Sequence, residues 1–444
     1  MVRSTKALLG LGALTATAAL VLAGCTSGGG GGGAEPEESE APESAACPPG
    51  ETGEVGGELA LKIGTALPVT GSLAFLGPPE IAGVEYAQTL INEYTETSGL
   101  SLEVVQGDSG DLDNRAYETE VPRLLSEGVS AIVGAASSGV SLQFIDQVVG
   151  DCTILFSPAN TSDQFTTYED NGMYFRTAPS DVLQGDVHGN FVAAEGHQTL
   201  GLLVMNDAYG TGLAEYITEA FEAAGGEVVA APTFNPGDTT FDAQISEVLA
   251  QDPDAISIIS FDEAGTIVPN IIDAGFPAEN LFFVDGNLAN YAEDPADPEK
   301  VSFPAGTLTG AKGTYPGPTP KQVADFISGL DEFVASQGDA PLGDYTYAPE
   351  SFDAVNLIAL AALAAGSDDP ATIASKLQEV SGGSGEGEKC ETFAACADII
   401  LGGGVADYDG VSSPVTFDEV GDPTEGMINT YIYQEDNTYV PYEG

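Results

Sequence analysis

The sequence predicts an α/β protein with two lobes, each built on a doubly wound parallel sheet. Apolar runs of strand length alternate with longer segments of helical periodicity, as in consecutive βαβ units with right-handed crossovers. The alternation begins near residue 59 and restarts after residue 180. The body that contains it, residues 59–444, is longer than one hydrophobic core usually supports. Two similar halves in series therefore indicate two lobes.

The N-terminus has the pattern of a lipoprotein signal peptide. Arg3 and Lys6 precede an apolar stretch that ends in the sequence Leu22-Ala-Gly-Cys25. This layout is typical of a secretory signal, and the last four residues resemble a bacterial lipobox. The resemblance implies removal of residues 1–24 and a lipid on Cys25. An uncleaved membrane helix is the alternative, but the stretch is on the short side of the ~20 apolar residues that a span needs, and no stop-transfer charges follow.

The segment 25–58 is predicted to be a flexible tether. A glycine run, Gly28 to Gly33, is followed by a stretch rich in Glu, Pro, Gly and Ser. Such a composition buries too little to offset the entropy lost on ordering. No later stretch is expected to cross a bilayer. We therefore expect an exported protein that is anchored to the cell membrane by lipid and folded outside the cytoplasm.

The composition is strongly acidic, with 69 Asp and Glu residues against 11 Lys and Arg. Loss of Arg3 and Lys6 with the signal would change the formal net charge from −58 to −60. Nucleic acids and anionic membrane surfaces attract the opposite charge, so neither is an expected partner. The acidity favours solubility, and a saline or alkaline habitat is one hypothesis for it.

Four cysteines follow the lipidation site, and an even number in an exported chain predicts disulfides. Cys390 and Cys396 close a short loop and are expected to pair. Cys47 and Cys152 then pair by elimination, which would join the end of the tether to the first lobe. A metal site is disfavoured because no C-x-x-C motif occurs and neither histidine lies near these cysteines. No metal and no cofactor are expected.

The elements of the first half follow in order along the chain. Strands are expected at the apolar runs 59–64, 102–105, 129–133 and 153–156. Helices are expected between them, at 78–94, at 115–127 and after a cap at Ser138. In the first of these helices, Ile81, Val84 and Ile91 share one face, and prolines at 78 and 79 suit a helix start.

The second half repeats this order. Strands are expected at 200–205, 227–231, 255–260 and 281–284, with helices at 212–224, 241–250 and 265–274. Later helices near 320–336 and 350–365 are expected to add to the first lobe. A final strand at 429–434 needs a sheet edge to join.

The loops between these elements carry a more specific signal. Six segments are distinctive in this order: 62–74 (KIGTALPVTGSLA), 132–140 (IVGAASSGV), 156–162 (FSPANTS), 175–181 (FRTAPSD), 207–213 (DAYGTGL) and 285–286 (DG). With these segments the chain resembles the branched-chain amino-acid (Leu/Ile/Val) binding family, the solute-binding lipoproteins of ABC importers. The resemblance covers essentially the whole body, from about residue 59 to 444.

The resemblance implies a type I periplasmic binding fold, in which two lobes joined by a three-strand hinge close on a ligand. It places 59–178 and 312–414 in the first lobe and 179–311 and 415–444 in the second. The implied function is capture of a small amino acid, aliphatic or branched-chain, for an importer with permease and ATPase subunits. The protein is expected to act as a monomer and to catalyse no reaction.

The ligand of an open α/β sheet lies beyond the carboxyl ends of its strands. In the first lobe, Ser137 and Ser138 follow one predicted strand, and Ala159 and Thr161 follow the next. Helix N-termini there would offer N–H groups and a positive dipole end to a carboxylate. The resemblance implies that Ser138 and Thr161 hold the α-carboxylate and that the Ala159 carbonyl accepts from the ammonium. Ordinary helix capping is the alternative role of the two hydroxyls.

In the second lobe the resemblance implies three ligand contacts. Asp285 matches the acidic position that neutralises the ammonium, and a buried carboxylate there would be costly without a cation. Tyr209 and Phe261 match aromatic positions that cover the ligand. The alternatives are a surface turn at Asp285 and packing beneath the loops for both rings. Leu76 of the first lobe stands near a position that is aromatic in some relatives, which leaves specificity open, although an apolar wall favours an aliphatic side chain.

Two other functions stay open. A receptor of the same fold for an amide, urea or an aromatic acid would not need Asp285. A sensor for a signalling partner is also compatible with the fold. An enzyme is disfavoured because no G-x-S-x-G motif occurs and neither histidine lies in a nucleophile motif.

Overall fold

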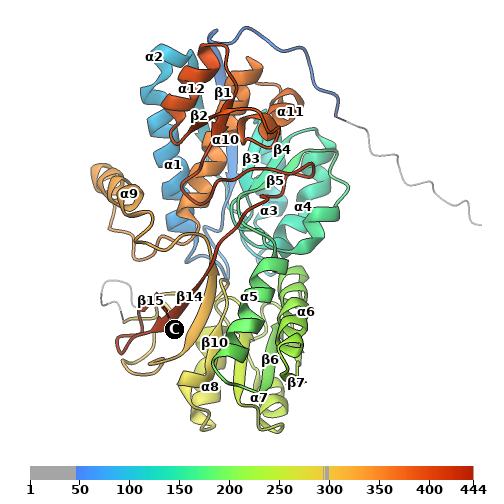
Figure 1. Cartoon of the computed structure of the whole chain (residues 1–444), viewed down its shortest axis with the longest axis vertical. Coiled ribbons are helices and arrows are strands. Elements are labelled where there is room, and N and C mark those ends of the chain that lie inside the picture. The colour runs from blue at the N-terminus through green and yellow to red at the C-terminus, as the bar shows by residue number, and fades with distance from the viewer. Residues whose placement is uncertain (1–46, 294, 296–299, 444) are drawn as a thin grey trace, which may run out of the picture. The chain divides into compact units, whose positions relative to one another are not determined.

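The computed structural model describes residues 47–293, 295 and 300–443. This part of the chain forms two sheets, each with its own helices and its own buried core (Figure 1). The predicted α/β class with two doubly wound lobes is confirmed. The predicted signal peptide (1–24), the lipidation site Cys25 and most of the predicted tether lie outside the described residues.

The first sheet has five parallel strands in the order β2-β1-β3-β4-β5. They are β1 (Leu59–Ala66), β2 (Leu100–Val105), β3 (Ala131–Gly134), β4 (Ile154–Ser157) and β5 (Tyr174–Arg176). The inner strands β3 and β4 are buried along their whole length, as parallel strands with helices on both faces must be. The chain order reverses between β1 and β3, and this switch point opens a crevice at their carboxyl ends.

The second sheet has the order β15-β14-β11-β10-β9-β6-β7, and β8 also pairs with β6. Its strands are β6 (Thr199–Met205), β7 (Glu227–Ala230), β8 (Thr233–Phe234), β9 (Ala255–Ile259), β10 (Leu281–Phe283), β11 (Lys312–Pro316), β14 (Ile428–Tyr433) and β15 (Tyr439–Pro441). The pairs are parallel up to β11, whereas β14 and β15 add in antiparallel fashion. The switch point lies between β6 and β9, and β14 is the predicted final strand with its sheet edge at β11.

Helices cover both sheets. Those of the first lobe are α1 (Gly77–Glu93), α2 (Thr95–Ser98), α3 (Tyr117–Ser126), α4 (Ser138–Gly150), α10 (Ala348–Ala365), α11 (Pro370–Val380) and α12 (Phe393–Leu401). The others are α5 (Asp181–Ala194), α6 (Ala208–Ala223), α7 (Asp242–Leu249), α8 (Ala264–Asp273) and α9 (Ala324–Gln337), with 3-10 turns at Asp163–Thr167 and Ala278–Asn280. Figure 1 shows α1 and α10 side by side in the first lobe, and α5 beside α6 in the second.

Several helix starts differ from the prediction. The N-cap of α4 is Ser137 rather than Ser138, because the Ser137 hydroxyl accepts the N–H of Val140 at 3.3 Å. Helix α6 begins at Ala208 rather than 212, because the carboxylate of Asp207 accepts the N–H of Gly210 at 2.7 Å. A side-chain cap of this kind defines the first turn.

The chain crosses between the two sheets three times, which fits the implied three-strand hinge. The crossings join β5 to α5, β11 to α10, and β13 (Ala406–Tyr408) to β14. The lobe limits as such stay a prediction, but two stretches lie elsewhere than expected. Residues 312–316 form β11 and pair in the second sheet, and Val415 and Phe417 are buried in the first core. Residues 312–316 therefore belong to the second lobe because of their strand pairing, and Val415 and Phe417 belong to the first because of their burial in its core.

Helix α10 corrects one expectation, that no later stretch could cross a bilayer. By length and composition alone, its 18 residues are apolar enough to do so. Nearly all of them are buried inside the first lobe, where α10 packs against α1, α11 and the strands of the first sheet. The apolar composition of α10 is therefore that of a core helix.

The predicted tether ends earlier than residue 58. Within 47–58, Cys47 is bonded to Cys152, and the N–H groups of Gly50 and Gly53 donate to the Thr372 hydroxyl and the Ala365 carbonyl. These bonds offset the entropy cost that the composition of this stretch could not. The predicted disulfide between Cys47 and Cys152 is confirmed.

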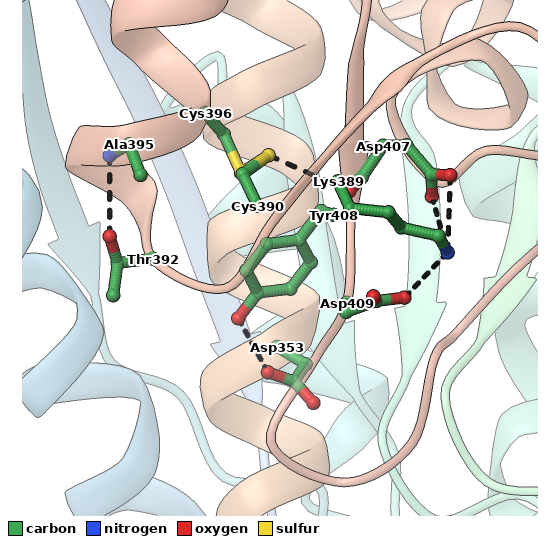
Figure 2. The surroundings of a disulfide bond; sticks show 9 residues. All are labelled: Asp353, Lys389, Cys390, Thr392, Ala395, Cys396, Asp407, Tyr408 and Asp409. Atoms are coloured by element: carbon green, nitrogen blue, oxygen red, sulfur yellow. Dashed lines mark hydrogen bonds and ion pairs between the residues drawn. A yellow bond between two sulfur atoms is a disulfide. The ribbon is translucent and has the colours of Figure 1, made fainter.

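The second predicted disulfide, Cys390–Cys396, is also confirmed. It links β12 (Glu388–Cys390), which pairs with β13, to α12 (Figure 2). Figure 2 shows the Lys389 ammonium between the carboxylates of Asp407 and Asp409, at 3.1 and 2.7 Å. The ion pairs hold β12 against β13, and the disulfide joins this small sheet to α12, which packs against α10 of the first lobe.

Candidate ligand-binding site

One pocket lies between the two lobes, at the carboxyl ends of their strands. Its walls come from the loops that follow β1, β3 and β4 in the first sheet and β6, β9 and β10 in the second. The lining residues are Leu73, Leu76, Ala136, Ser137, Ser138, Ala159, Thr161, Tyr209, Phe261, Asp285, Gly286 and Tyr347. All eight residues nominated from the sequence as ligand contacts are among them. The structure brings these residues together, and their contact with a ligand stays a prediction.

The pocket is narrow because the lobes touch around it. Its enclosed volume is about 20 Å³, room for a single water-sized group. The Tyr216 hydroxyl of the second lobe donates to the Asp163 carboxylate of the first at 2.6 Å, and the Ser162 hydroxyl donates to the Ala208 carbonyl at 3.2 Å. An amino acid of the size of leucine therefore does not fit the pocket in this arrangement of the lobes.

Asn160 braces the two first-lobe loops of the site. Its amide Nδ2 donates to the carbonyls of Ala135 and Ala136 at 3.0 and 2.9 Å, which joins the loop after β4 to the loop after β3. The Ser138 hydroxyl makes a second link, because it accepts the N–H of Ser162 at 3.2 Å. The predicted carboxylate contacts thus stand on loops that hold each other in place.

Arg176 supports the same loops from behind. Its guanidinium is fully buried and donates to the carbonyls of Asn160 and Ser162 at 3.3 and 2.7 Å. It also forms a bidentate pair with Asp422, at 2.6 and 2.7 Å. Because Asp422 neutralises its charge, Arg176 fixes the geometry of the loops rather than offering a free cation to a ligand.

Asp285 is the polar centre of the second-lobe wall. Its carboxylate is buried and accepts hydrogen bonds from the hydroxyls of Tyr209 and Tyr347, each at 2.7 Å, and from Nε2 of Gln184 at 3.0 Å. Burial raises the pKa of Asp285, and these hydrogen bonds oppose the rise. Three hydrogen-bond donors thus stabilise the buried carboxylate, so its burial does not by itself require a cation, contrary to the expectation from the sequence.

The two predicted aromatic contacts pack on each other beside Asp285. The rings of Tyr209 and Phe261 are stacked, with centroids 5.5 Å apart and planes inclined by 17°. Packing, the alternative proposed for them, is therefore observed, and the Tyr209 hydroxyl bonds to Asp285 as well. The stacked pair gives this wall a fixed aromatic surface.

A second carboxyl group, Asp181, lies near the site at the start of α5. It is fully buried, and burial and then the charge of Asp285 raise the pKa of Asp181 well above its usual range. Burial and the nearby Asp285 therefore favour the neutral acid at Asp181.

The sequence of this chain matches a known protein family. A family model described as periplasmic binding protein matches residues 60–389, well over half of the chain. The chain belongs to the periplasmic binding protein family. The resemblance stated from the sequence is thus confirmed, and this periplasmic binding protein is a binding protein rather than an enzyme.

Three similar proteins illustrate the relationship. The Leu/Ile/Val-binding protein homolog 2 of Brucella abortus is 26% identical over 325 residues, 72% of this chain and 82% of that protein. The chemotactic signal transduction system substrate-binding protein BasB of Halobacterium salinarum is 26% identical over 376 residues, 82% of this chain and 85% of that protein. The crystal structure of the branched-chain amino acid transporter substrate binding protein LivJ of Streptococcus pneumoniae, in complex with isoleucine, matches with a TM-score of 0.66. It is 23% identical, over 86% of this chain and 99% of that one.

Sequence reasoning missed Tyr347 and Gln184 of this periplasmic binding protein. Tyr347 lies 62 residues after Asp285 and reaches it only because the second crossover returns there. Gln184 stands on α5, a helix that we did not predict. The sequence Tyr345-Thr-Tyr347, directly before an apolar helix, is a local feature that could have drawn attention to Tyr347. It does not indicate that the Tyr347 hydroxyl would bond to Asp285.

Proposed function

We propose that this protein captures a small amino acid with an aliphatic, branched side chain between its lobes. It would deliver the amino acid to an ABC importer with permease and ATPase subunits, acting as a monomer that is exported and anchored through Cys25. The names of the similar Brucella and Streptococcus proteins, which refer to Leu/Ile/Val and to branched-chain amino acids, support this ligand class.

The main support for the proposal is that the two lobes place different polar groups on opposite sides of one pocket. Ser138 and Thr161 stand on the first-lobe side, where the N-terminus of α4 favours an anion. Asp285 stands on the second-lobe side, where a carboxylate favours a cation. A zwitterion satisfies both sides at once, and only when both lobes contact it, so ligand binding would stabilise the closed form.

The remaining wall suits an uncharged side chain. Leu73, Leu76 and Ala136 are apolar, and each lines the pocket. They lie in the hydrophobic cluster of the second lobe although the first lobe supplies them. A branched aliphatic group between them would replace the contacts that they now make across the lobes.

The test compares leucine with 4-methylpentanoate, which is leucine without its ammonium. Calorimetric titration of the full chain should show that leucine, isoleucine or valine binds and that 4-methylpentanoate binds far more weakly. Asp285→Asn should weaken leucine binding roughly 100-fold or more, because the ammonium loses its buried partner. The same variant should leave the weak binding of 4-methylpentanoate nearly unchanged.

Asp273→Asn, which makes the same charge change at an exposed residue of α8, is the matched control. Equal affinity for leucine in the wild type and in Asp285→Asn would contradict the role of Asp285. Binding of only urea, amides or benzoate would keep the fold and replace the ligand class.

A sensor is the second candidate function. The Halobacterium relative is named for a chemotactic signal transduction system. Neighbouring permease and ATPase genes would favour transport, whereas a neighbouring kinase gene would favour sensing.

A further inference from the structure

A second cavity lies on the other side of the Tyr347 segment. Its volume is about 270 Å³, far more than that of the pocket between the lobes. Its walls are the loop after β11, the start of α9, residues 343–350 and the strands β14 and β15, which can be located in Figure 1. No proposed ligand contact lines it, so it is a separate site.

The side chains of this cavity are aromatic and acidic. Tyr315, Tyr345, Tyr431 and Tyr439 contribute four rings, and prolines add apolar surface. The charged side chains that line it are Asp344 and Glu350, and none of its lining residues is Lys, Arg or His. Tyrosine faces and carboxylates both attract cations, whereas an anion would find no partner here.

Glu350 places a buried carboxyl group in the wall of the cavity, and one oxygen of this group, Oε2, lacks a hydrogen-bond partner. Behind it, Glu80 of α1 is also fully buried, and neither of its carboxylate oxygens has a partner. Among the described residues no Lys or Arg forms an ion pair with either glutamate. Such a buried carboxyl group is costly to ionise without a partner, so a cation bound in the cavity would stabilise the ionised form of Glu350.

We propose that this cavity is a second binding site, which takes a small organic cation of the alkylammonium type. The tyrosine rings would contact the alkyl groups and the positive charge, and Glu350 and Asp344 would supply the opposite charge. An alkylated ammonium fits better than a hydrated metal ion because much of the wall is ring and proline surface.

The proposed site has a pH dependence that follows from its surroundings. Burial raises the pKa of Glu350 to about 8. The titratable groups that act on it are the carboxyls of Glu80 and Asp353 and the phenols of Tyr315 and Tyr431, and none of these carries a positive charge. A bound cation favours the ionised form of Glu350, so its affinity should rise roughly tenfold between pH 6.5 and pH 8.5.

The test uses choline and its uncharged carbon isostere, 3,3-dimethyl-1-butanol. The full chain is titrated with each by calorimetry, with sodium chloride holding the ionic strength constant. We expect saturable choline binding and at least tenfold weaker binding of the alcohol. At pH 8.5, where Glu350 is largely ionised, Glu350→Gln and Asp344→Asn should each weaken choline binding about tenfold. Glu222→Gln, an equal charge change at an exposed residue of α6, should have no effect.

Three outcomes would overturn the proposal: no saturable choline binding, equal affinity for the alcohol, or unchanged choline affinity in both cavity variants. The measurement does not involve leucine, so it is independent of the proposed function. Folding does not confound it either, because Glu350→Gln removes a buried acid and keeps its shape.

Discussion

His188 is a buried base with a complete set of hydrogen bonds. Its Nδ1 lies 2.8 Å from the Thr314 hydroxyl and its Nε2 lies 2.9 Å from the Ser257 hydroxyl. Burial lowers the pKa of His188 from 6.5 to about 3. The folded protein therefore keeps this ring neutral at pH values where the unfolded chain protonates it.

This difference predicts a pH-dependent contribution to stability. The contribution is complete above pH 6.5 and is lost as the pH falls from 6.5 towards 3, because only the unfolded state takes up the proton. The loss is about 1.4 kcal/mol per pH unit. Urea unfolding of the wild type and of His188→Gln at pH 7.5, 5.5 and 4.5 should show the difference in their unfolding free energies changing at this rate between pH 5.5 and 4.5, with a smaller change per unit above pH 5.5.

The second histidine provides the comparison. His197 is only partly buried, so His197→Gln should change the slope less. A constant difference between the wild type and His188→Gln across this pH range would show that folding does not lower the pKa of His188.

Single residues of the candidate site differ in how far the sequence could indicate them. Ser138, Thr161 and Asp285 each follow a recognisable strand, so their place at a carboxyl edge was predictable. Tyr347 was not, because its contact with Asp285 depends on the path of a crossover and not on any local pattern. The hydrogen bonds that Tyr347 and Gln184 donate to Asp285 offset part of the cost of burying its carboxylate, and no local pattern around Asp285 indicates them.

At the scale of whole elements, α5 shows why one helix escaped prediction. Gly185 and Gly189 lie in its interior, and glycine lowers helix propensity. A Cβ atom at Gly185 would come within 2.3 Å of the Tyr216 Cβ, and one at Gly189 within 2.6 Å of the Ile217 carbonyl oxygen. The close packing of α5 on α6 requires both glycines. The helix therefore forms because of this tertiary contact and in spite of its low intrinsic helix propensity. The apolar strands, by contrast, were predictable because burial on both faces selects continuous apolar runs.

The third crossover is pinned to β5 by the pair of Arg176 and Asp422. Asp422→Asn would leave the Arg176 charge buried without its partner. We expect the variant to lose about 3–5 kcal/mol of unfolding free energy. Equilibrium unfolding in denaturant measures this loss.

The double variant Arg176→Met with Asp422→Leu separates charge from packing. It should be more stable than Asp422→Asn alone, because no uncompensated charge remains. If the double variant were the less stable of the two, the ion pair itself, rather than the burial of a lone charge, would be what holds the crossover.

At the scale of the whole molecule, the proposed anchor is the feature that decides where the protein works. Residues 1–46 lie outside the described part, so the prediction of a lipid on Cys25 rests on the sequence. When the chain is produced in bacteria with its signal, the wild type should partition into a detergent phase. Cys25→Ala should partition into the aqueous phase, because the acyl chains supply the membrane affinity.

Ser27→Ala, next to the proposed lipidation site, is the control and should partition like the wild type. Detergent-phase recovery of Cys25→Ala equal to that of the wild type would show that another feature holds the protein to the membrane.

The bond between Cys47 and Cys152 has a consequence for proteolysis. A cut anywhere between these two cysteines, for example in the loop after β2, leaves both fragments covalently joined. In the proposed anchored form, such a nicked molecule would stay attached to the cell and its first lobe would stay in one piece. A cut between the proposed lipidation site and Cys47 would instead shed the whole body from the membrane.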